Sequence, residues 1–219
     1  MPRVPSPLPR QIYSGSVTTM DPVHDDSARN ARPVSTSDEP RIAPVTMDTA
    51  TQFQAEQLEA LGGDNALNLF KTLANHPRLL KRWLPFGGSL LYGNSLSDRD
   101  REIVILRVAA LCGSDYEWGQ HVGIARSAGL SDEEMRALAP HGDPAGIFTD
   151  AERALIKAAD QLVTQHVVDT PTWETLSGIY DTEQLVSLTL LAGHYAMLAG
   201  FLSSAGVQTE SPLPRIGEV

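Results

Sequence analysis

Apolar residues recur every three to four positions along most of the chain from about residue 52, the spacing that places them on one face of an α-helix. Capping residues punctuate this pattern, since Ser, Thr or Asp precedes several apolar stretches and Gly or Pro follows them. No stretch gives convincing alternation of apolar and polar residues between hairpin turns. The pattern therefore predicts an all-α fold, with helices at about 67–73, from Pro77 onward, at 98–112, 116–128, 131–140 and 149–166, from Thr170 onward, and at 181–205.

The helix expected at 98–112 differs from the others because it is apolar on nearly all sides. Its run IVILRVAALC, at 103–112, is interrupted only by Arg107. A helix without a polar face is buried, so this one must lie at the centre of the protein or at a subunit interface. A Gly-Ser-Asp sequence at 113–115 then breaks the chain, and we expect the next helix to pack antiparallel against it.

The two ends of the chain lack this helical pattern. Residues 1–45 hold eight of the 15 prolines, and such a segment cannot bury enough apolar surface to offset the entropy lost on ordering, so we expect a flexible arm. The arm could instead wrap a neighbouring subunit, or be upstream sequence if the natural start is Met20 or Met47. Residues 46–210 are expected to form the helical domain, and residues 211–219 a frayed tail.

Charge and composition narrow the possible functions. The chain has 17 Lys and Arg against 27 Asp and Glu, a net charge of -10, and this field repels the phosphate backbone of nucleic acids. No uninterrupted apolar run approaches the roughly 18 residues of a membrane span, and the first residues lack the apolar core of a secretion signal. We therefore expect a cytoplasmic protein with no nucleic-acid or membrane partner. A single cysteine, Cys112, excludes a disulfide or a redox-active dithiol within the chain.

Three titratable side chains can meet around the two central helices. Glu102 begins the apolar helix, while Glu117 and His121 lie four residues apart on the next helix and share a face. If these helices are antiparallel, Glu102 and His121 can face each other, and partial burial would let the carboxyl and the imidazole exchange a proton near neutral pH. Plainer interpretations stay open, because Glu102 can complement the helix dipole and the other two can form a surface pair. A metal site would require more ligands than Glu and His residues at this spacing provide.

The sequence around these residues resembles a known family. The segment LSDRDREIVILRVAALCGSDYEWGQHVGIARSAGLSDEEM, at 96–135, resembles the central part of the carboxymuconolactone decarboxylase and alkylhydroperoxidase-D-like superfamily, and the similarity extends over about 67–207. In the hydroperoxidase branch the motif is a glutamate, then CxxC, then a histidine four residues after the second cysteine. Carried onto this chain, the glutamate falls on Glu102 and the histidine on His121.

The cysteine positions of that motif carry other residues here. They fall on Ser114 and Glu117, and neither side chain can supply the thiols that attack a peroxide and resolve the product. The decarboxylase branch also lacks the CxxC and is thought to work by proton transfer, so the resemblance implies Glu102, His121 and Glu117 as catalytic residues. It further implies an alkylhydroperoxidase-D-like helical bundle, a homo-oligomer that is most often a trimer or hexamer, and no cofactor or metal.

Further side chains are candidates for contact with a substrate because they flank the catalytic residues or interrupt apolar helices. Three of them have structural alternatives: Arg107 can form a buried ion pair, His194 can be hydrogen-bonded within the core, and Trp83 can be a core residue. The candidates are Ser114, Tyr116, Trp118, Arg107, His194 and Trp83.

Together these features predict a cofactor-free acid/base enzyme that acts on a small organic metabolite, by decarboxylation, isomerisation, dehydration or cyclisation. Two alternatives stay open. Cys112, which we expect to be a small buried apolar residue, could instead reduce peroxides with an external thiol. The protein could also be a non-catalytic oligomeric binding protein that keeps the fold without the chemistry.

Overall fold

Local capping signals set the helix boundaries. In the computed structural model, which describes residues 39–93 and 95–219, the side chains of Ser97, Ser131 and Thr149 each accept a hydrogen bond from a backbone N–H in the first turn of a helix.

The described residues contain no β-strand, which confirms the all-α prediction. Their α-helices are α1 (Gln52–Glu59), α2 (Asn68–Leu73), α3 (Pro77–Tyr92), α4 (Asp98–Cys112), α5 (Asp115–Ser127), α6 (Asp132–Leu138), α7 (Asp150–Gln165), α8 (Thr170–Ser177) and α9 (Thr182–Ala205), with a short 3-10 helix at Gly63–Asn65.

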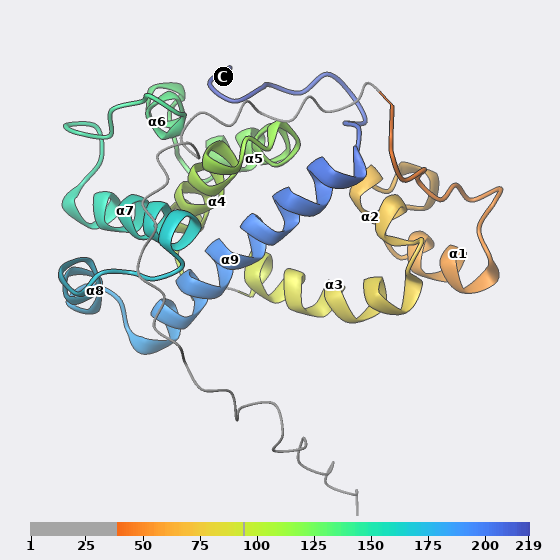
Figure 1. Ribbon diagram of the computed structural model, residues 1–219, viewed down its shortest axis with the longest axis horizontal. Coiled ribbons are helices and arrows are strands. Elements are labelled where there is room, and N and C mark those ends of the chain that lie inside the picture. The colour runs from red at the N-terminus through yellow and green to blue at the C-terminus, as the bar shows by residue number, and fades with distance from the viewer. Residues whose placement is uncertain (1–38, 94) are drawn as a thin grey trace, which may run out of the picture. The chain divides into compact units, whose positions relative to one another are not determined.

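Helix α4 is the centre of the fold. It packs against α5, α7 and α9, and its apolar side chains are buried by these neighbours within one subunit. Gly113 ends α4 with a φ of 66°, a left-handed conformation that glycine adopts without steric penalty. The chain then turns directly into α5, which brings Glu117 and His121 beside α4. In Figure 1, α9 runs diagonally between the α4–α5 pair and α3.

Helix α3 closes the other side of α9 and has an unusual composition. It contains Pro85 in its interior, which removes one backbone hydrogen bond of the helix, and Gly87 and Gly88 follow directly. A Cβ atom at Gly87 would lie 3.5 Å from Nε2 of His194 on α9, and one at Gly88 would meet nothing within 4 Å. The missing side chains therefore leave room between α3 and α9.

The predicted N-terminal arm falls largely outside the described residues, which begin at residue 39. Its last residues are attached to the helical domain. The backbone N–H groups of Arg41 and Ile42 both donate to the carbonyl of Ala205, at 2.9 and 3.0 Å, and the side chain of Val45 is buried. The described part of the predicted arm thus belongs to the folded domain, which begins before residue 46.

The C-terminal residues differ from the frayed tail expected at 211–219. The backbone N–H of Ile216 donates to Oδ1 of Asp115 at 3.0 Å, and Ile216 and Val219 pack against the apolar cluster of α4, α5 and α6. These residues are extended and carry no helical spacing of apolar positions. Helical periodicity in the sequence therefore could not predict the contacts they make. The tail is held because α5 offers it a carboxylate and an apolar surface.

Among the described helices, α9 alone is long and apolar enough to cross a membrane. Its most apolar window of 18 residues has a mean hydropathy of 1.7, and 50% of that window is buried inside the protein. The core helix of a soluble protein passes the same test of length and composition, so this feature is weak evidence for a membrane span.

Candidate functional site

Glu102 and His121 meet between α4 and α5. Oε2 of Glu102 lies 2.7 Å from Nδ1 of His121, and the two residues are 0% and 5% exposed. Nε of Arg101 donates to the other oxygen of Glu102, Oε1, at 3.0 Å. Because both oxygens of this carboxylate face donors, we assign the proton of a neutral His121 to Nδ1, which leaves Nε2 with a lone pair. The structure thus brings together the two residues on which the sequence hypothesis depends.

The second ring nitrogen of His121 faces two other groups. The hydroxyl of Tyr195, on α9, lies 3.2 Å from Nε2, and Oε2 of Glu117 lies 3.8 Å from the same atom. The Tyr195 ring meets the imidazole edge-on, with centroids 5.2 Å apart and an interplanar angle of 86°. His121 is therefore oriented from both sides, by α4 at Nδ1 and by α9 at Nε2.

Glu117 is a buried carboxyl with an unsatisfied oxygen. The residue is 3% exposed, and its Oε1 atom has no hydrogen-bond partner within the described part of the chain. Burial raises the pKa of Glu117 to about 7, although the interaction with His121 acts in the opposite direction. This carboxyl can therefore hold or release a proton near neutral pH, which is the property of a general acid or base.

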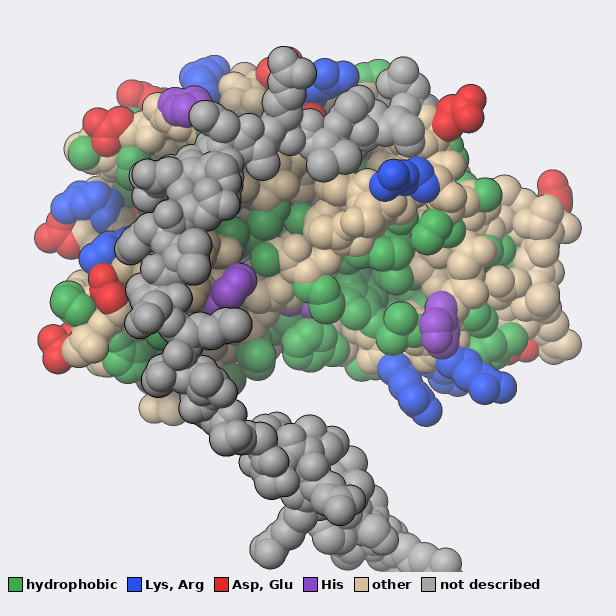
Figure 2. All heavy atoms as spheres, in the orientation of Figure 1, with side chains coloured by type: hydrophobic (Ala, Val, Ile, Leu, Met, Phe, Trp, Pro, Cys, Tyr) green, Lys and Arg blue, Asp and Glu red, His purple; other side chains and the backbone are tan. Residues whose placement is uncertain are grey.

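These groups open onto a cavity of about 340 Å³ between α3, α5 and α9. Its volume lies at the lower end of the roughly 300–1,000 Å³ typical of small-molecule sites. Figure 2 shows hydrophobic side chains gathered over this area, between α9 and α3. Leu, Ile, Phe and Trp residues make up half of the described lining, and none of its members is Lys or Arg. The polar lining residues are Tyr92, Tyr116, Glu117, Gln120, His121, His194 and Tyr195.

His194 and Trp83 form an aromatic wall of this cavity. Their rings stack with centroids 5.4 Å apart and an interplanar angle of 23°, and Phe86 meets His194 edge-on at 5.3 Å. Burial lowers the pKa of His194, which favours its neutral form. Its Nδ1 atom is buried and has no hydrogen-bond partner among the described residues. Both residues were candidates from the sequence, and both line the cavity.

Tyr116, another predicted candidate, also lines the cavity and is held by the C-terminal segment. Its hydroxyl donates to Oε1 of Glu210 at 2.8 Å and accepts the backbone N–H of Leu69 at 3.3 Å. Nε2 of Gln120 donates to Oε2 of the same Glu210 at 2.8 Å. One carboxylate from the segment after α9 therefore positions two side chains of the lining.

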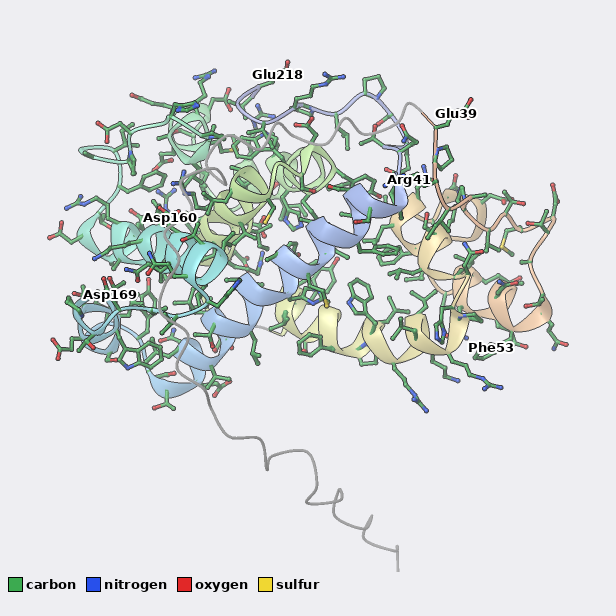
Figure 3. All side chains as sticks on the ribbon, in the orientation of Figure 1. Glu39, Arg41, Phe53, Asp160, Asp169 and Glu218 are labelled. Atoms are coloured by element: carbon green, nitrogen blue, oxygen red, sulfur yellow. The ribbon has the colours of Figure 1, made fainter. Side chains whose placement is uncertain are left out.

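Three predicted contact residues lie outside the cavity lining, so the structure does not support a contact with substrate there. Trp118 is fully buried in the apolar core beside α4, because it points away from the helix face that carries Glu117. Arg107 pairs with the carboxylate of Asp160 on α7, which Figure 3 labels, at 2.5 and 3.0 Å. Ser114 caps α5, where its hydroxyl accepts the backbone N–H of Glu117 at 3.4 Å.

Two residues at the site were not predicted. Tyr195 is 74 positions away from His121 in the chain, and the available signal was a His-Tyr pair inside an apolar helix, of which only His194 was selected. Arg101 stands directly before Glu102 in a first helical turn that looks solvated, yet it is only 7% exposed. Its burial depends on the packing around α4, which the sequence pattern does not specify.

A reactive-cysteine site and a metal site both have little support in the described residues. Cys112 is outside the cavity lining, it packs against the core around α4, α7 and α9, and burial raises the pKa of its thiol. Over residues 39–93 and 95–219, no three His, Cys, Asp or Glu side chains are placed to hold a metal ion together.

Comparison with known proteins gives a match over the region that contains the candidate site. Residues 77–161 match the model of the Carboxymuconolactone decarboxylase family, and this region holds Glu102, Glu117 and His121. This central region, which covers less than half of the chain and includes α4 and α5, is therefore similar to the carboxymuconolactone decarboxylase family. A comparison with curated proteins finds no match.

Solved structures of AhpD-like and peroxidase-related proteins share the fold. An uncharacterized peroxidase-related protein from Ralstonia eutropha JMP134, described as an alkylhydroperoxidase AhpD core, has a TM-score of 0.62 and 16% identity over 78% of this chain and 93% of its own. An uncharacterized peroxidase-related protein from Silicibacter sp. TM1040 has a TM-score of 0.61 and 18% identity over 83% and 96%. A protein of unknown function from Agrobacterium tumefaciens, named for antioxidant defence and AhpD, has a TM-score of 0.56 and 20% identity over 62% and 93%. At these identities the similarity establishes the fold.

Proposed function

We propose that this protein is an enzyme of cofactor-free proton transfer, acting on a small organic molecule in the cavity by a reaction such as decarboxylation, isomerisation or cyclisation. The observation that carries the proposal is the buried contact of 2.7 Å between Glu102 and Nδ1 of His121. It directs Nε2 of His121 toward Glu117 and the cavity. An imidazole with a carboxylate on one nitrogen has a fixed tautomer, and its other nitrogen can accept a proton.

In the proposed reaction, His121 and Glu117 divide the roles of base and acid. Nε2 of His121 takes a proton from a carbon next to a carbonyl group, and the electron pair of the broken C–H bond moves toward the carbonyl oxygen. Glu117, in its protonated form, donates a hydrogen bond or its proton to that oxygen. Return of a proton to a different carbon completes an isomerisation. Glu102 is a positioning residue in this scheme, because it is fully buried and reaches the substrate only through His121.

The alternative of peroxide reduction is less well supported by the residues of this chain. Two of the structural neighbours carry a peroxidase-related name, but the positions that correspond to the CxxC hold Ser114 and Glu117 here. A thiolate is the reactive form of cysteine, and burial raises the pKa of Cys112. A carboxyl with a pKa near 7 at the second cysteine position fits proton transfer better.

We also propose that the enzyme is a cytoplasmic homo-oligomer, a trimer or hexamer, with a small-molecule substrate. Support for assembly comes from α9, where Val186, Leu190 and Met197 are 53%, 48% and 56% exposed. Exposed apolar side chains along one helix are typical of a surface that contacts another protein.

A reporter of carbon-proton removal tests the function without knowledge of the natural substrate. 5-Nitrobenzisoxazole is uncharged, and removal of its ring C–H proton by a base breaks the N–O bond and yields a coloured cyanophenolate. We expect the purified protein to accelerate this elimination and the His121→Ala variant to lose at least about 100-fold of the acceleration, the usual contribution of a general base. Equal rates in the two proteins, or no acceleration by the wild type, would contradict the proposal and favour a binding protein.

The Glu102→Gln variant separates positioning from a general loss of structure. We expect its rate to fall as well, because the amide no longer holds Nδ1 of His121 as the protonated nitrogen. The ¹⁵N chemical shifts of the His121 ring should then report a change toward the Nε2–H tautomer, which a merely structural role of Glu102 would not produce. Circular dichroism of both variants checks that the helices persist.

A further inference from the structure

Two buried polar atoms of the cavity have no partner in the described residues. Oε1 of Glu117 and Nδ1 of His194 are both free of hydrogen bonds, and their residues are 3% and 5% exposed. Buried polar groups are almost always hydrogen-bonded in folded proteins, so an unpaired one calls for an unseen partner. Both residues line the same cavity, and because neither atom is itself accessible, a small rotation of each side chain would bring it to a ligand there.

The charges around the cavity restrict what that ligand can be. Glu117 is the one acidic residue of the described lining, which includes no Lys or Arg. The three arginines of α4 are engaged elsewhere. Arg99 pairs with Glu134 and Glu152, Arg101 pairs with Asp98 and Glu102, and Arg107 pairs with Asp160. A carboxylate or phosphate in the cavity would therefore be desolvated beside a carboxyl group, without a counter-ion.

The remaining lining is apolar or aromatic and sets the character of the ligand body. Leu, Phe and Trp side chains surround the space, and the rings of Trp83 and His194 are stacked on one wall. Burial of apolar ligand surface against such a lining is favourable, while a few polar groups fix the orientation. The polar atoms available for this purpose are those of Glu117 and His194, together with the hydroxyl of Tyr195.

We propose that the cavity binds an uncharged, largely apolar molecule that places a carbonyl oxygen against Glu117 and a second polar group against Nδ1 of His194. This inference deepens the proposed proton-transfer function and rests on it for the conversion of the ligand, though not for its binding. An uncharged ligand has no carboxylate to lose. Among the candidate reactions, the cavity therefore favours isomerisation or cyclisation of a neutral carbonyl compound over decarboxylation of a free acid.

Three probes of similar size and different charge test the inference with the full-length protein. They are 4-phenylbutan-2-one, 3-phenylpropanoate and 3-phenylpropylamine, titrated at pH 6 while tryptophan fluorescence is followed. Trp83 is the one tryptophan of the described cavity lining, so a Trp83→Phe variant should remove the response. We expect the ketone to bind at least about tenfold more tightly than either charged probe. The lining has no Lys or Arg to pair with the carboxylate, and at pH 6 Glu117, whose pKa is about 7, is largely protonated and offers little counter-charge to the amine. Any other ranking, or no response to any probe at millimolar concentration, would overturn the proposal.

Two variants identify the site and separate the failure of this inference from that of the proposed function. Gly88→Leu places a side chain in the open space of the cavity and should weaken ketone binding at least tenfold. Gly123→Leu adds the same side chain at an exposed glycine of α5 outside the cavity lining, where a Cβ atom also meets nothing within 4 Å, so ketone binding should stay within about threefold of the wild type. Unchanged binding in Gly88→Leu, or equal loss of binding in both variants, would overturn the assignment of the cavity. Normal ketone binding without any elimination of 5-nitrobenzisoxazole would contradict the proposed catalysis while leaving the ligand class in place.

Discussion

Glu117 is the residue whose protonation state decides the charge of the cavity. The titratable groups that interact with it are His121 and Tyr116 on its own helix and Tyr195 from α9. Burial raises the pKa of the Tyr195 phenol, which therefore keeps its proton. Around neutral pH the charge of the cavity therefore changes with the protonation of Glu117, whose pKa is about 7.

The raised pKa of Glu117 predicts a pH dependence of stability. A solvated glutamate has a pKa of 4.5, and folding raises that of Glu117 to about 7, so the unfolded chain releases this proton at a lower pH than the folded protein. Below about pH 4.5 the residue imposes no penalty, and between the two values rising pH costs the folded state up to about 3 kcal/mol. Urea unfolding at pH 5 and pH 8 measures the difference. Glu117→Gln should lose that part of the pH dependence, and an unchanged difference between the two pH values would contradict the prediction.

At the residue scale, the sequence predicted the contacts that are close along the chain and missed those that are distant. Glu102 and His121 lie on consecutive helices joined by a glycine turn, so their encounter followed from local reasoning. Tyr195 reaches His121 from the last helix, and that approach depends on how α9 packs against α4 and α5. No local signal specifies such a docking.

At the scale of elements, capping and periodicity predicted the helices well, while the direction in which each helix face points was harder to predict. Tyr116 and Trp118 both flank Glu117, but Tyr116 lines the cavity and Trp118 is enclosed in the core. The C-terminal segment was missed for a related reason. A Cβ atom at Gly119 would lie 2.6 Å from Cβ of Leu213, so the glycine permits a close crossing that only the folded structure reveals.

The two glycines of α3 allow a matched test of how this helix forms the cavity wall. A Cβ atom at Gly88 meets nothing within 4 Å, while one at Gly87 would lie 3.3 Å from Cζ2 of Trp83 and 3.5 Å from Nε2 of His194. Gly88→Ala should therefore stabilise the protein by about 0.5–1 kcal/mol, because alanine loses less entropy in a helix. Gly87→Ala should gain less, since the stacked rings must move.

Chemical denaturation of the two alanine variants, with the ketone titration as a second measurement, checks this prediction. Gly88→Ala should bind 4-phenylbutan-2-one nearly as well as the wild type, and Gly87→Ala should bind it more weakly. Equal stabilisation and equal binding in both variants would show that the spacing between α3 and α9 is not set by Gly87.

At the scale of the whole molecule, the all-round apolar helix α4 turned out to need no second subunit, because α5, α7 and α9 cover it. The sequence therefore predicted the centre of the fold but gave no sign of which surface is left for assembly. The surface that we propose for assembly is on α9, another helix without a polar face, which is only partly covered by its neighbours. Its outward positions Val186, Leu190 and Met197 lie on the side away from the core.

Assembly through this face of α9 predicts a specific effect of one substitution. Leu190 lies near the middle of the exposed positions and is 48% exposed, so Leu190→Glu should leave the subunit folded but place a charge in the contact, where burial without a partner is costly. Analytical ultracentrifugation should show a trimer or hexamer for the wild type and a smaller species for Leu190→Glu. Ala60→Glu adds the same charge at an exposed position of another element and should leave the mass unchanged. A monomeric wild type, or an unaltered mass in Leu190→Glu, would contradict assembly through α9.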